Sequence, residues 1–169
     1  MKSSIEPMDT SDVGARFRGF TLVEILIVVV ILAILAAMII PQFASATTQS
    51  RQSVFASNLK ELTKSAELFK LDNNGWPPDG GSGSTPAGME NYIQSGKFEA
   101  VTPIGGVWDF EYQDAGGVTA AVGVHFNGSG ETRGDAFMNE IDALLDDGDV
   151  ASGRFRLLEA NRYYFVLEE

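Results

Sequence analysis

Apolar residues are concentrated near the N-terminus of the chain. Sixteen consecutive apolar residues occupy positions 25–40, and the 21 residues from Phe20 to Ile40 carry a single charge, on Glu24. A helix of this length rises about 31 Å, which matches a bilayer core of about 30 Å. No other stretch of the sequence approaches this pattern. We therefore expect one membrane-spanning or membrane-anchoring helix.

The helical pattern continues beyond the apolar run. Between Gln42 and Leu71 there is neither glycine nor a further proline. Apolar residues recur there at spacings of four and three residues, which is one face of a helix; they are Phe55, Leu59, Leu62, Ala66 and Phe69. Asn73-Asn74-Gly75, followed by two prolines, predicts the end of the helix. We expect a helix over 20–71 with a kink at Pro41, because proline lacks the N–H group that a helix interior requires.

The remaining segment, 76–169, shows strand patterns. Aromatic and acidic residues alternate over 107–112, which is typical of a half-buried strand, and apolar residues alternate over 118–126. Residues 154–158 and 162–167 predict a closing hairpin, and Asp135 is expected to cap a helix that ends near Gly148. The predicted fold class is α+β, with a four-stranded antiparallel sheet packed on the second half of the long helix.

Composition excludes several classes of function. The chain has 169 residues, no cysteine, one histidine (His125) and a net charge of −11. The lack of cysteine excludes disulfides and thiolate metal sites. The negative charge repels the phosphates of nucleic acids, so nucleic acid binding is not expected. His125 lies in an apolar strand pattern, where we expect a core or edge histidine rather than a catalytic one. We therefore expect no enzyme, no catalytic residue and no cofactor.

Four acidic residues near the C-terminal end of the predicted second helix are candidate metal ligands: Asp142, Asp146, Asp147 and Asp149. Closely spaced carboxylates can bind Ca²⁺, but this run does not have the spacing of an EF-hand loop. We expect a solvated helix end and assign no metal ligand, and the sequence leaves calcium binding undecided.

Charges around the apolar run predict its orientation. Arg16 and Arg18 precede the run, and the first basic residue after it is Arg51. Because basic residues stay on the cytoplasmic side, the N-terminus is expected inside and the acidic C-terminal part outside. Two interpretations are an uncleaved anchor and a signal peptide cut after Ala46. The apolar run is longer than that of an ordinary signal peptide, however, and neither interpretation accounts for Glu24.

The segment from Arg18 to Leu26, RGFTLVEIL, supports a third interpretation. It resembles the processing site of type IV prepilins and type II secretion pseudopilins. The resemblance implies cleavage between Gly19 and Phe20, N-methylation of Phe20, and a role for Glu24 as the fifth residue of the mature chain. Pro41 falls where many members of the family have a proline.

The resemblance also implies a domain organisation and a pilin-like fold. The leader would occupy 1–19, the transmembrane or filament-core half-helix 20–41, an amphipathic half-helix 42–75, and a globular antiparallel β-sheet domain 76–169. A carboxylate in the bilayer costs about 2.5–3.5 kcal/mol, which marks Glu24 as functional. In a filament it can pair with the N-terminal amine of a neighbouring subunit and set the axial register.

The expected function is that of a structural filament subunit rather than an enzyme. Its implied partners are other copies of the chain, related minor subunits, the prepilin peptidase and an assembly platform in the bacterial inner membrane. The chain would cross that membrane once and then enter a periplasmic or extracellular filament. The alternative is a secreted or anchored binding domain whose N-terminus serves only for targeting. The sequence does not decide between a pilus and a pseudopilus, between a major and a minor subunit, or between Met1 and Met8 as the start, and it does not identify a surface ligand. The lack of cysteine favours a pseudopilin.

Overall fold

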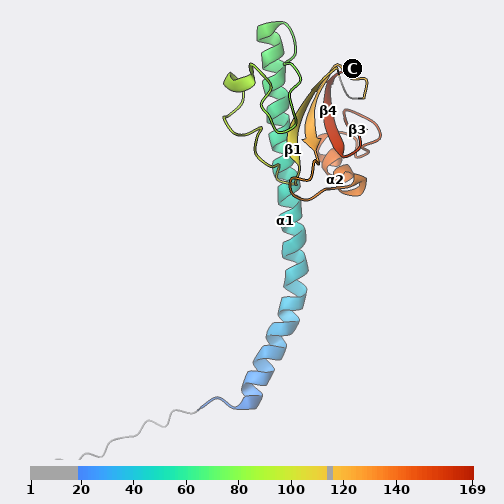
Figure 1. The fold of residues 1–169 in the computed structure, drawn as a ribbon. Coiled ribbons are helices and arrows are strands. Elements are labelled where there is room, and N and C mark those ends of the chain that lie inside the picture. The colour runs from blue at the N-terminus through green and yellow to red at the C-terminus, as the bar shows by residue number, and fades with distance from the viewer. Residues whose placement is uncertain (1–18, 114–115) are drawn as a thin grey trace, which may run out of the picture. The chain divides into compact units, whose positions relative to one another are not determined.

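One long helix, α1 (Leu22–Asn73), dominates the N-terminal part of the chain in a computed structural model that describes residues 19–113 and 116–169 (Figure 1). The chain forms two compact units, of which the first ends at Phe43 and the second begins at Ala44. Helix α1 contributes residues to both. Of the predicted leader, only Gly19 belongs to the described residues.

The described part of the first unit is an apolar helical segment with exposed side chains. An 18-residue window within α1 has a mean hydropathy of 3.3, and none of it is buried in the chain. The helix continues through Pro41 without interruption. By length and composition this segment is able to cross a membrane.

In the second unit, α1 buries the apolar face that the sequence predicts. Phe55, Leu59, Leu62, Ala66 and Phe69 are all at most 8 % exposed. The helix ends at Asn73, and the next residue, Asn74, has a φ of 53°, the left-handed conformation typical of a helix C-terminus. Both the apolar face and the end of the helix are therefore confirmed.

A four-stranded antiparallel sheet packs on this half of α1. Its strands are β1 (Val107–Tyr112), β2 (Ala120–His125), β3 (Phe155–Glu159) and β4 (Arg162–Glu168), in the order β1-β2-β4-β3. A 3₁₀ helix, η1 (Met89–Asn91), lies between α1 and β1, and α2 (Asp135–Leu145) lies between β2 and β3. Phe55 of α1 stacks on Trp108 of β1 with ring centroids 5.0 Å apart. The predicted α+β class and the four antiparallel strands are confirmed.

Two local expectations are wrong. Asp135 does not cap α2: the N-cap is Gly134, and the Asp135 carboxylate accepts a hydrogen bond of 2.6 Å from the Tyr163 hydroxyl of β4. Strand β1 is also not half-buried, because Asp109 and Glu111 on its second face are each only 2 % exposed. In both cases residues distant in the sequence supply the contact.

Candidate functional site

The start of α1 is organised by Thr21 and Glu24. The Glu24 carboxylate accepts hydrogen bonds of 2.8 Å from both the backbone N–H and the hydroxyl of Thr21. The backbone N–H of Glu24 in turn donates to the Thr21 hydroxyl oxygen at 3.2 Å. This reciprocal arrangement is a capping box, which satisfies N–H groups that the first helical turn leaves unpaired. This local role of Glu24 was not predicted, although the Thr-x-x-Glu spacing is the sequence signature of a capping box.

The residues before this cap are accessible. Gly19 and Phe20 lie outside the helix, and the Phe20 side chain is 81 % exposed. A Cβ atom added to Gly19 would meet no atom within 4 Å. The peptide bond between the two residues therefore lies in exposed, non-helical chain directly before the capping box.

Glu24 retains capacity for a further partner. It lies among apolar side chains, of which Leu22 and Val23 are 86 % and 62 % exposed. Among the described residues Glu24 forms no ion pair, and the hydrogen bonds of its carboxylate are both with Thr21. Since an ionised carboxylate has about four acceptor sites, a cation from another molecule can still approach it.

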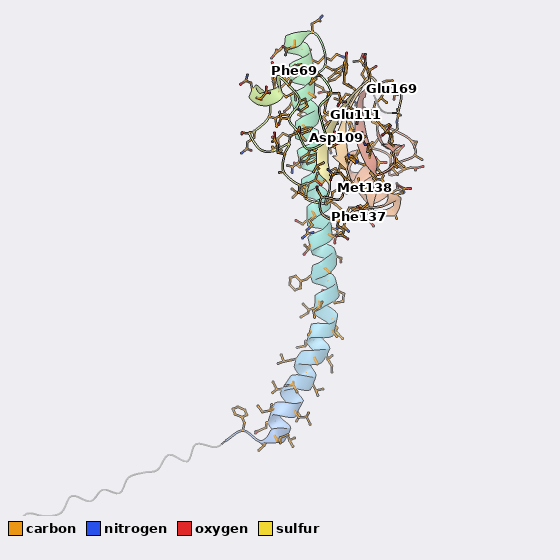
Figure 2. The ribbon with its side chains drawn as sticks, in the orientation of Figure 1. Phe69, Asp109, Glu111, Phe137, Met138 and Glu169 are labelled. Carbon is orange, nitrogen blue, oxygen red and sulfur yellow. The ribbon has the colours of Figure 1, made fainter. Side chains whose placement is uncertain are left out.

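A buried polar cluster lies on the face of the sheet turned away from α1, where Figure 2 labels Asp109 and Glu111. The Tyr164 hydroxyl lies 2.7 Å from Asp109 Oδ2 and 3.0 Å from Glu111 Oε1, and Arg162 lies 2.5 Å from the same Glu111 oxygen. Burial raises the pKa of Glu111 above its usual range, with Asp109 adding repulsion. The cluster holds β1 and β4 together across β2.

His125 belongs to the same cluster. Its Nδ1 atom lies 2.8 Å from the Ser82 hydroxyl, which donates to Asp109 Oδ2 at 2.7 Å. Burial lowers the pKa of His125. A catalytic triad requires the serine and the aspartate on opposite ring nitrogens, whereas here both lie on the Nδ1 side, with Asp109 at 3.9 Å. The half-buried histidine therefore attaches the glycine-rich loop around Ser82 to the sheet.

The acidic run after α2 is only partly a solvated helix end. Asp142, Asp146 and Asp147 each place one carboxylate oxygen within 4.8 Å of the others. Asp142 is fully buried; its Oδ2 accepts from the Gly148 N–H at 2.9 Å, and its Oδ1 has no hydrogen-bond partner. Burial, reinforced by contact with Asp147, raises the pKa of Asp142 to about 6. The expectation of solvation is thus wrong for Asp142, while Asp149 is exposed.

Comparisons with known proteins agree with the geometry of the N-terminal segment. Residues 14–40 match the family model described as "Prokaryotic N-terminal methylation motif". The chain is 40% identical over 76 residues to type II secretion system core protein G of Pseudomonas aeruginosa. These 76 residues are 45% of this chain and 49% of that protein. The chain is 35% identical over 95 residues to the type IV wide pilus major component PilA4 of Thermus thermophilus, covering 53% and 72% of the two chains.

A third relative extends the match further along the chain. Type II secretion system core protein G of Dickeya chrysanthemi is 32% identical over 105 residues, which is 58% of this chain and 67% of that protein. The match to the Pseudomonas protein spans about half of its length. No solved structure matches the chain.

Proposed function

Because this chain belongs to the family of type IV pilins and type II secretion pseudopilins, we propose that it is a structural subunit of a helical filament. The observation that carries the proposal is the combination of an exposed Gly19–Phe20 bond, a carboxylate at Glu24 and an apolar helix with no internal partner. An apolar surface of this size must be covered by lipid or by other subunits.

The proposed maturation proceeds from the N-terminus. A prepilin peptidase on the cytoplasmic side cleaves after Gly19, where no side chain obstructs the backbone, and Phe20 is then N-methylated. The new amine stays basic after methylation. The mature chain keeps the net charge of −11, because the leader contains three acidic and three basic residues.

Glu24 is proposed to set the register of subunits. As a subunit leaves the bilayer for the filament, its Glu24 pairs with the Phe20 amine of a neighbour, and a displaced subunit leaves both charges unpaired in a medium of low dielectric constant. Pro41 is proposed to kink the helix, since it cannot donate a hydrogen bond to Ala37. Assembly also needs a platform in the inner membrane, with the globular domain outside, and related minor subunits.

The mature N-terminus and the Glu24 charge test this proposal. Intact mass and N-terminal sequencing of the protein from its native host should find a methylated Phe20 as the first residue. Glu24→Ala should abolish filament assembly. Glu24→Gln is the matched variant, because glutamine can retain the capping box but not the charge. We expect Glu24→Gln to fail as Glu24→Ala does.

The alternative, a secreted or anchored binding domain, makes different predictions. A protein that begins at Thr47 would support it and exclude the filament. Assembly that survives Glu24→Gln and fails in Glu24→Ala would show that Glu24 acts only as a helix cap.

A further inference from the structure

A groove with an apolar floor and a basic rim runs between α1 and the sheet in the second unit. Its volume is about 220 Å³. Leu59, Leu145 and Phe165 form the apolar part, and Lys60, Lys64 and Arg154 line it with positive charge. These residues come from α1, the end of α2, the residue directly before β3, and β4, so that only the folded chain assembles the groove.

The three cations of the groove form no ion pair with the described residues, although the chain has a net charge of −11. Elsewhere in the described chain, five basic side chains form ion pairs with carboxylates: Lys70, Lys97, Arg133, Arg156 and Arg162. None of the three groove cations forms one among the described residues. Glu67 is the single acidic residue that lines the groove. The side chains that line the groove therefore carry three positive charges and one negative charge.

Two of these cations are held by backbone carbonyl groups. Lys60 Nζ donates to the Leu144 carbonyl at 3.1 Å. The Arg154 guanidinium donates to the Val166 carbonyl at 3.0 Å and lies over the Phe165 ring. Lys64 is exposed and its side chain forms no hydrogen bond with the described residues. Lys64 is therefore the cation most available to another molecule.

An acidic hollow lies on a different flank of α1. The loop around η1 places Glu90 and Glu99, both exposed, around a hollow of about 200 Å³ with Ile93 at its wall. This loop contacts α1 through Ser65, whose hydroxyl donates to the Tyr92 carbonyl, and through an ion pair between Lys97 and Glu61.

Helical geometry separates the two surfaces. At 3.6 residues per turn, the face of α1 that holds the loop, with Glu61 and Ser65, is rotated by roughly 100° from the face that carries Lys60 and Lys64. Within the second unit, Figure 1 shows the segment around η1 and the α2–β3 side on opposite sides of α1. The basic groove and the acidic hollow are therefore distinct patches of one subunit.

We propose that the basic groove of one subunit receives the acidic η1 loop of a second copy, with Lys64 facing Glu90 and Glu99. This inference rests on the proposed function and names a contact between subunits outside the membrane. A contact between two different patches of identical subunits repeats from one subunit to the next, and it builds a filament when the rotation between subunits does not close a ring. It also offsets the repulsion between acidic subunits that are packed together.

The acidic run after α2 fits this role less well. The run follows Leu145 and precedes Arg154, both of which line the groove, so it belongs to the same patch. Two such patches would meet as a closed two-fold pair and could not extend.

Disulfide trapping tests the contact, and the absence of native cysteine makes the full-length chain suitable. Two differently tagged copies are produced in the same cells, one with Lys64→Cys and the other with Glu90→Cys, and are oxidised in the membrane or filament. The control pairs Lys64→Cys with Asp149→Cys, an exposed acidic position in the run after α2. We expect about tenfold more cross-tag dimer from the first pair, since a docked contact raises the effective concentration of the two thiols. Equal yields, or a larger yield from the control, would overturn the proposal.

Charge reversal provides a second measurement. Lys64→Glu and Glu90→Lys should each reduce filament yield about fivefold, as expected for the loss of an exposed ion pair, and the double variant should restore it. Both positions are exposed, so the fold should persist. A double variant as poor as the single ones contradicts the contact.

Failure of this contact can be distinguished from failure of the proposed function. An amine-reactive cross-linker applied to the unmodified chain reports multimers whatever their geometry. Multimers without the specific disulfide would refute the groove contact, and the proposal that the chain is a filament subunit would still hold. Complete absence of multimers would refute both.

Discussion

Glu24 and Asp142 are both carboxylates on helices, and their surroundings give them different chemistry. Glu24 lies in the first turn of α1 and accepts two hydrogen bonds from Thr21. Asp142 lies near the end of α2, fully buried, with one oxygen unpartnered and two further carboxylates within 4.8 Å. A buried acid without a cationic partner favours its protonated form.

Asp142 should make the stability of the second unit depend on pH. Its pKa is raised to about 6 in the folded chain from an ordinary value near 4. The folded state thus binds the Asp142 proton more tightly than the unfolded state does. Protonation of Asp142 therefore stabilises the fold fully below about pH 4, and this contribution is lost as the pH rises through about 6. Asp142→Asn should raise the free energy of unfolding by about 2 kcal/mol at pH 7.5 and leave it nearly unchanged at pH 4.

Denaturation of the full chain in detergent with a chelator, followed by tryptophan fluorescence, measures this effect. Asp149→Asn is the matched control, because it makes the same substitution at an exposed position of the same acidic run. A loss of stability in Asp142→Asn at pH 7.5 would contradict the interpretation.

Among the elements, the contact between β2 and β4 depends on a glycine. A Cβ atom at Gly123 would lie 2.0 Å from the Tyr163 carbonyl oxygen. The two strands pair at this point, with Gly123 opposite Tyr164. The sheet therefore has no room for a side chain at the centre of β2 without moving β4.

Gly123→Ala should destabilise the second unit by about 3 kcal/mol or more, since the clash is with backbone rather than with a flexible side chain. Gly75→Ala is the control, because a Cβ atom there meets nothing within 4 Å. If Gly123→Ala folds, denaturation measures the difference in stability between the two variants. If it does not fold, the loss of protease resistance relative to Gly75→Ala shows the destabilisation. Equal stability of the two variants would show that β4 can shift at no cost.

At the scale of the whole molecule, the two compact units share α1, and Pro41 lies close to the boundary between them. Proline removes one helical hydrogen bond, and its ring crowds the carbonyl group four residues earlier. The helix is accordingly expected to be weakest near the end of its apolar segment.

Pro41→Ala should make α1 more uniform across this boundary. Spin labels at Val30→Cys and Ser53→Cys, in the otherwise cysteine-free chain in bilayers, should give a narrower distance distribution after the substitution. Labels at Ser53→Cys and Leu68→Cys lie on one side of Pro41 and should be unaffected. An unchanged distance distribution for the first pair of labels would contradict the proposal that Pro41 kinks the helix.

The sequence by itself determined the features that depend on neighbouring residues. The apolar period of α1, its end at Asn73 and Asn74, and the four strands follow from side-chain spacing and local backbone preference, so they could be predicted. Residues Gly19 to Glu24 could be singled out for the same reason, because their motif is contiguous. The capping box was also readable from the spacing of Thr21 and Glu24.

Only the tertiary structure decided which polar residues are buried and which cations remain unpaired. Asp109 and Glu111 look like surface residues in the sequence, because Arg162 and Tyr164, which contact them, come from a distant strand. Asp142 also looks like a surface residue in the sequence and is buried in the fold. Lys64 and Arg154 are 90 positions apart and meet at one groove through the packing of α1 on the sheet. Periodicity places a residue on a face of its own element, whereas burial and charge balance depend on what packs against that face.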